Sequence, residues 1–338
     1  MRVLKRFFFL HEWIDICLVL GAIASIVGTY WDIQYHVDIG RESFWIAPHL
    51  VVYGGTVLVL GASLLALRTV STLSSTVRNK VRMALRLIFM SVVFFLLGAP
   101  IDDLWHRIYG LDVTVWSPPH IYLIVMGFCI TLSLIYFQRL YLFLTRRDRV
   151  RHITIDELGL EFMCALGLVG LNIIFAEFEF FQQIENFTFF HLRYDWIYLL
   201  GMAVLFPFIL TLAKTLITTK WTATRIAFMY FLLRSAITLV LVYLVGGASF
   251  PMLPVFAFIP AVLFDVVYRK KDSVHLVWAS GLFVVLLYSL QSAVFLLIDV
   301  PKYIPKSALE VAVAIVAGVF AAFAGRWIGE HMLAKMKR

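Results

Sequence analysis

Two stretches of the sequence place one carboxylate and two imidazoles at matching intervals. In each stretch an aspartate comes first, a histidine follows four residues later, and a second histidine follows after a further 13 or 14 residues. The two sets are Asp32, His36 and His49, and Asp102, His106 and His120. Residues four apart share one face of a helix, so the first two side chains of each set can face a common point. Carboxylate and imidazole ligands suit copper, zinc or non-haem iron.

These sets belong to a longer internal repeat. The matched pairs are Gly28 and Gly98, Asp32 and Asp102, His36 and His106, Gly40 and Gly110, Trp45 and Trp116, Pro48 and Pro119, and His49 and His120. Each copy lies between two apolar runs, so the repeat unit is a helical hairpin with its outer turn, used twice in the same orientation. Glycine and proline interrupt the helix after the second ligand, and the returning chain can bring the third ligand back to the first two. Asp103 is three residues from His106 and is the alternative to Asp102 as a ligand.

The composition identifies the elements that must position these residues. The chain has 338 residues, of which 62% are hydrophobic and 15% charged, whereas soluble domains average about 25% charged residues. Most of its apolar runs are long enough to cross a bilayer, and backbone groups in lipid must bond internally. We therefore expect an all-α, polytopic membrane protein with about ten transmembrane helices. The predicted spans are 14–36, 47–67, 86–106, 118–139, 158–181, 195–214, 224–246, 251–268, 275–298 and 307–329.

The net charge of +8 has a membrane explanation. Its basic residues fall in short clusters between alternate spans, which is the positive-inside pattern, and this distribution does not indicate a nucleic-acid partner. The pattern predicts a multi-pass protein of the cell membrane with both termini cytoplasmic and both metal motifs on the outer side. We expect its partners to be the lipid bilayer and other membrane subunits.

The sequence predicts two regions. The first, residues 1–145, is the duplicated metal-motif region, with its repeats at about 24–67 and 94–139, and the second, residues 146–338, is a six-helix membrane region. At the end of the fifth predicted span, Glu177 lies on the same side as the repeats and could complete a metal site or relay protons.

The first copy also carries a wider pattern around its ligands. An Arg-acid-small-Phe stretch follows the second ligand, and a proline comes just before the third. The residues concerned are Asp32, His36, Arg41, Glu42, Ser43, Phe44, Pro48, His49, Tyr53 and Gly54, and the second copy keeps Trp105, His106, Asp112, Pro119 and His120. The pattern resembles the metal motif of the C subunit of the copper-dependent membrane monooxygenases, the family of particulate methane and ammonia monooxygenases. The likeness covers some 25 residues of each copy.

The resemblance implies copper at the first set, and the second set could bind it likewise. It also implies that the protein could be a subunit of an oxygenase acting on a small substrate, alongside other membrane subunits. Zinc or iron remains an alternative metal. The alternative function is a non-catalytic structural or electron-transfer subunit of a membrane respiratory complex. Haem could be held in such a subunit between His36 and His106 or between His49 and His120.

Overall fold

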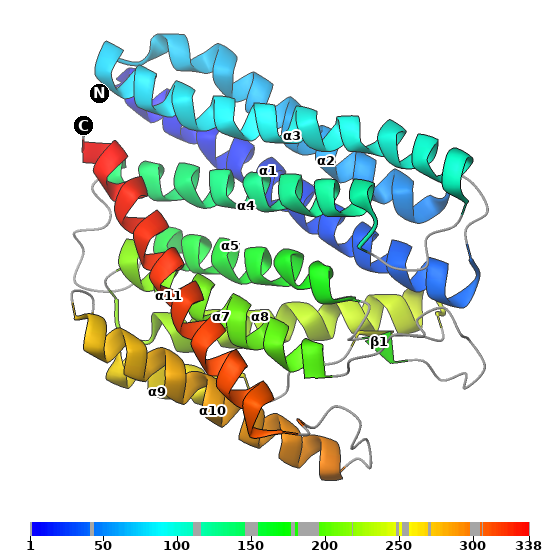
Figure 1. The fold of residues 1–338 in the computed structure, drawn as a ribbon. Coiled ribbons are helices and arrows are strands. Elements are labelled where there is room, and N and C mark those ends of the chain that lie inside the picture. The colour runs from blue at the N-terminus through cyan, green and yellow to red at the C-terminus, as the bar shows by residue number, and fades with distance from the viewer. Residues whose placement is uncertain are drawn as a thin grey trace. The chain divides into compact units, whose positions relative to one another are not determined.

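The computed structural model describes residues 2–40, 44–110, 116–145, 155–176, 180–181, 196–217, 219–247, 250–251, 257–269, 272–297, 305 and 307–337. Within these ranges the chain is almost entirely helical (Figure 1). The helices are α1 Arg2–Asp38, α2 Ala47–Thr69, η1 Val70–Thr72, α3 Ser75–Tyr109, α4 Pro118–Thr145, α5 Ile155–Asn172, η3 Ile173–Phe175, α7 Trp196–Leu216, α8 Thr222–Leu239, η4 Val240–Leu244, α9 Phe258–Val267, α10 Ser273–Leu297 and α11 Ala308–Lys337. The two-residue strands are β1 Phe180–Phe181 and β2 Phe250–Pro251.

Nine of the helices in the described residues are long and apolar enough to cross a membrane. The expected all-α, polytopic membrane fold is therefore confirmed. The predicted eighth span, 251–268, contains the shorter helix α9, which has ten residues. At 1.5 Å per residue it is about 15 Å long, about half the thickness of a hydrocarbon core. Pro251 and Pro254 in the sequence explain why a longer helix is disfavoured here.

The described helices divide between two compact units. The first contains α1 to α4 and residues 239–247, and the second contains α5, α7, most of α8, and α9 to α11. In the second unit α7 is central, because α5, α10 and α11 all pack against it. The α7–α11 contact is close: a Cβ atom added at Gly325 would lie 2.2 Å from the backbone oxygen of Phe208.

The first unit consists of two successive helical hairpins. Helix α1 packs against α2, α2 against α3, and α3 against α4 (Figure 1). The matched glycines Gly28 and Gly98 lie at close helix crossings, one turn before Asp32 and Asp102. A Cβ atom at Gly28 would lie 2.8 Å from the backbone nitrogen of Val52, and one at Gly98 would lie 2.4 Å from the Leu123 side chain. These glycines therefore let the two helices of each hairpin approach each other next to the carboxylate.

Candidate metal centres

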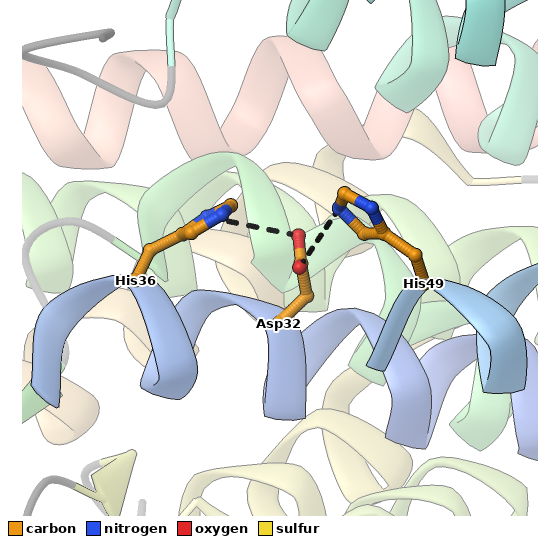
Figure 2. A group of neighbouring side chains, drawn as sticks. All are labelled: Asp32, His36 and His49. Atoms are coloured by element: carbon orange, nitrogen blue, oxygen red, sulfur yellow. Dashed lines mark ion pairs between the residues drawn. The ribbon is translucent and has the colours of Figure 1, made fainter. Parts of the chain in front are cut away.

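The first set of residues forms a cluster at the end of the first hairpin (Figure 2). One nitrogen or oxygen atom of each of Asp32, His36 and His49 lies within 4.8 Å of the other two. Asp32 and His36 lie one turn apart near the end of α1, and His49 lies in the first turn of α2. Figure 2 shows the carboxylate between the two imidazoles. Asp32 Oδ1 is 3.0 Å from His49 Nε2, and its Oδ2 is 3.9 Å from His36 Nδ1.

The second set forms an equivalent cluster between α3 and α4. Asp102, His106 and His120 again have ligand atoms within 4.8 Å of one another. Both imidazoles face the same carboxylate oxygen, since Asp102 Oδ1 is 3.4 Å from His106 Nε2 and 3.2 Å from His120 Nε2. The ring centroids are 5.9 Å apart, close to the 6.1 Å between His36 and His49. The duplicated sequence pattern therefore produces a duplicated arrangement of donor groups.

Glycine and proline direct the chain between the ligands of each cluster. Gly40 follows α1 with φ of +93°, and Gly110 follows α3 with φ of +85°. In this left-handed region a side chain is strained, so glycine ends both helices cleanly after the second ligand. Prolines then occupy the first turns of α2 and α4, where the missing backbone N–H costs no helical hydrogen bond. The third ligand, His49 or His120, follows directly.

A backbone carbonyl fixes the protonation pattern of His49. Its Nδ1 atom lies 2.8 Å from the carbonyl oxygen of Phe44. A carbonyl oxygen can only accept, so Nδ1 carries the proton, and in the neutral ring Nε2 carries a lone pair. This Nε2 atom faces Asp32 Oδ1, which is buried and makes no hydrogen bond of accepted geometry. A neutral His49 would therefore place two acceptor atoms 3.0 Å apart, whereas a doubly protonated ring would form an ion pair with Asp32.

The second cluster repeats this arrangement on a different imidazole. His106 Nδ1 lies 2.9 Å from the carbonyl oxygen of Gly110, so Nδ1 again donates and Nε2 of the neutral ring is an acceptor. That Nε2 atom faces Asp102. Histidines that ligate metals usually donate their other ring N–H to a carbonyl or carboxylate, which orients the ring. Each cluster contains one such oriented histidine.

Three of the contact distances match those of ligands that share one ion. Nitrogen and oxygen ligands lie about 2.0–2.2 Å from zinc, and two ligands at this distance that subtend about 90–110° at the ion are about 2.8–3.6 Å apart. The contacts of Asp32 with His49 and of Asp102 with His106 and His120 measure 3.0, 3.4 and 3.2 Å. The contact between Asp32 and His36, at 3.9 Å, is longer. Both clusters are well shielded, with side chains between 9% and 24% exposed.

The surroundings of the clusters differ. Around His49, the Phe44 ring stacks on Tyr53 at 5.5 Å, and both rings lie within 6 Å of the imidazole. The residue matched to Tyr53 in the second copy is Ile124. Two aromatic rings therefore flank His49 in the first cluster, and the position matched to Tyr53 is aliphatic in the second copy. Asp32 also interacts electrostatically with His120, so the two clusters are close enough for their charges to influence each other.

The structure distinguishes between the two candidate carboxylates of the second copy. Asp103 accepts a hydrogen bond from Arg107 Nε at 2.7 Å, whereas Asp102 contacts both histidines. Asp102 is thus the carboxylate of the cluster. Glu177 lies outside the described residues. Sequence reasoning did not predict that the carbonyls of Phe44 and Gly110 orient the ligand histidines. The only signal was the match of Gly110 with Gly40, which indicated a special backbone position at Gly110.

Fold and site together define a class: the chain is an all-α, multi-pass membrane protein with two groups of side chains that could hold a metal ion. No family model, curated protein or solved structure matches the chain.

Replacing Gly110 with alanine tests the role of the carbonyl at this position. We expect the positive φ to cost about 1–2 kcal/mol with a side chain present, and relaxation of the turn should move the carbonyl away from His106. Metal affinity at the second cluster should fall severalfold, while the first cluster keeps its affinity. Competition with a chromophoric chelator measures both. Gly61→Ala is the matched control, because this helical glycine has open space where a Cβ atom would lie; an equal effect of the two substitutions would contradict the assignment.

Proposed function

We propose that the protein binds one metal ion in each cluster, that copper is the metal, and that the protein serves as a subunit of a membrane oxygenase acting on a small substrate. In this proposal Asp32, His36 and His49 hold one ion, and Asp102, His106 and His120 hold the other. The loops that carry the clusters face the outer side of the cell membrane, as the distribution of basic residues indicates.

The observation that carries the proposal is the contact between Asp32 Oδ1 and the acceptor nitrogen of His49. These atoms are 3.0 Å apart, and His49 already donates its ring proton to Phe44. With a neutral His49 this contact is repulsive unless a metal ion lies between the two atoms. A shared metal ion removes the repulsion and uses all three donors of the cluster.

An extra proton on the imidazole is the competing explanation. A protonated His49 would form an ion pair with Asp32 Oδ1, and His36 lies 3.9 Å from the other oxygen of the same carboxylate. In the second cluster, two imidazoles face one oxygen of Asp102, and protonating both would place two cationic rings 5.9 Å apart. One divalent ion satisfies the carboxylate and both rings at once, which favours the metal.

Two considerations support copper and the oxygenase function. Imidazole and carboxylate donors bind Cu²⁺ more tightly than the other divalent ions of the first transition series. The residues of the first cluster also resemble the copper motif of the membrane monooxygenases. Copper bound there would supply the capacity to activate oxygen. The chain itself would hold each ion through the three ligands of its cluster, limit access of water to the first cluster through Phe44 and Tyr53, and admit an apolar substrate from the bilayer.

Metal analysis of the intact protein, purified from membranes, tests the proposal. We expect about two copper atoms per chain, one for each cluster. His36→Ala and His106→Ala should each remove about one atom, and the double variant should retain none. His331→Ala is the matched control, since this histidine bonds to the Trp327 carbonyl within the second unit and belongs to neither cluster.

An absorption spectrum of the same preparation distinguishes the alternatives. A spectrum without a haem band, together with copper, supports the proposal. Stoichiometric zinc or iron instead of copper would support the two metal sites and would refute copper as the metal. A haem band that disappears in His36→Ala would refute the proposed ligand sets, and a metal content unchanged by both substitutions would refute the sites themselves.

A further inference from the structure

A hollow of about 330 Å³ lies along one face of the first half of α3, the helix whose last turns carry Asp102 and His106. Its lining residues all come from this helix and are Asn79, Arg82, Met83, Arg86, Leu87 and Met90. The polar residues lie toward the start of the helix, and the apolar ones continue toward its middle. The hollow therefore changes from basic to apolar along the helix axis.

The two arginines of the hollow are available to an external anion. Arg82 is half-buried and Arg86 is exposed, and within the described part of the chain neither forms an ion pair. Arg107 and Arg225, by contrast, pair with Asp103 and Glu161. Arg82 and Arg86 are one helical turn apart, so both guanidinium groups can reach one ligand. The guanidinium fork binds phosphate through paired hydrogen bonds.

An exposed apolar stripe continues from the arginines along α3. Its residues are each between 42% and 50% exposed and are Met83, Leu87, Met90, Phe94, Leu97 and Ile101. The opposite face of the helix is buried, with Leu85, Ile88 and Val92 fully inaccessible. From Met90 to Ile101 the stripe is about 16 Å long, which is about half of the 30 Å hydrocarbon core. This is the depth that an acyl chain of one leaflet covers.

We propose that this face of α3 binds an anionic phospholipid. The phosphate lies between Arg82 and Arg86, and an acyl chain follows the stripe from Met90 to Ile101. A free phosphate would use the arginines and leave the stripe unused. A second copy of this chain, packed by symmetry on the same face, would bring like charges together at the arginines. An amphiphile with one negative headgroup complements both parts of the surface.

Native mass spectrometry of the detergent-solubilised protein tests this proposal. The protein is titrated with dioleoyl phosphatidylglycerol or dioleoyl phosphatidylcholine, which differ only in the headgroup. We expect the wild type to bind phosphatidylglycerol at least about tenfold more tightly. The double variant Arg82→Gln/Arg86→Gln should reduce this preference to within about twofold. Leu87→Asn should weaken binding of both lipids, because it interrupts the stripe without changing the charge.

The matched control is Arg68→Gln/Lys335→Gln, which removes the same charge from two exposed basic residues outside the hollow. It should leave the preference unchanged, and circular dichroism should show equal helicity in all variants. An equal loss of preference in the control would show general attraction to the basic surface and would overturn the proposal. A wild type without preference would also overturn it, as would a dimer that forms through the stripe and excludes lipid.

Discussion

Replacing Asp102 with asparagine should lower the metal affinity of the second cluster by about 100-fold or more. Loss of a residue that only orients a ligand already costs about 10- to 100-fold, and Asp102 is a ligand itself in this proposal. Asp102 contributes the one oxygen that both His106 and His120 face. An asparagine of the same size removes the negative charge that balances the ion. The neighbouring substitution Asp103→Asn should change the affinity by less than about threefold, because Asp103 bonds to the exposed Arg107.

Chelator competition with purified protein measures this pair of variants. To isolate the second cluster, both substitutions are made in a His36→Ala background, which removes the first site. The comparison is sharp because the two aspartates are adjacent in sequence and the substitutions are chemically identical. A larger effect of Asp103→Asn than of Asp102→Asn would show that the cluster uses the other carboxylate.

Replacing Arg225 with alanine should destabilise the second unit by about 3–5 kcal/mol, the usual cost of breaking a buried ion pair on one side. Arg225 Nε and Nη2 donate to the two carboxylate oxygens of Glu161 at 2.7 and 2.5 Å. The Glu161 side chain is fully buried. Without the guanidinium, a buried carboxylate on α5 would have lost its charge partner.

The midpoint of unfolding in detergent, by heat or by increasing sodium dodecyl sulfate, measures the change. Arg107→Ala is the control, because the Arg107 side chain is 73% exposed, and exposed ion pairs contribute about 0–1 kcal/mol. The double variant Arg225→Met/Glu161→Met should recover most of the stability, since an apolar pair often replaces a buried ion pair without loss. Equal destabilisation by Arg225→Ala and Arg107→Ala would contradict the argument.

The spans could be predicted from sequence because apolar runs of this length have few alternatives to membrane helices. That the three ligands of each set lie close together could also be predicted from the sequence. Asp32 and His36 share a helix face at four-residue spacing, and Gly40 with Pro48 requires the chain to turn before His49. Since the pattern occurs twice, the second copy supports the interpretation of the first.

Other features depend on contacts that sequence periodicity does not encode. The hydrogen bond from His49 to the Phe44 carbonyl depends on the backbone conformation of the residues just before α2. The pair of Glu161 and Arg225 joins residues 64 positions apart, and no local pattern connects them. The repeat alignment favoured Asp102 over Asp103, and the coordinates add the reason that Asp103 takes no part, because it accepts a hydrogen bond from Arg107.

Each cluster joins two helices, with two donors from the first helix of a hairpin and the third from the next. An ion held in this way would tie the hairpin ends together in addition to any chemistry it performs. Because a ligand that binds only the native state stabilises it, scarcity of such a metal would leave a chain whose hairpins open more easily at the ends that carry the clusters. Such a chain would be a better substrate for membrane proteases, so the abundance of the protein would follow the supply of its metal.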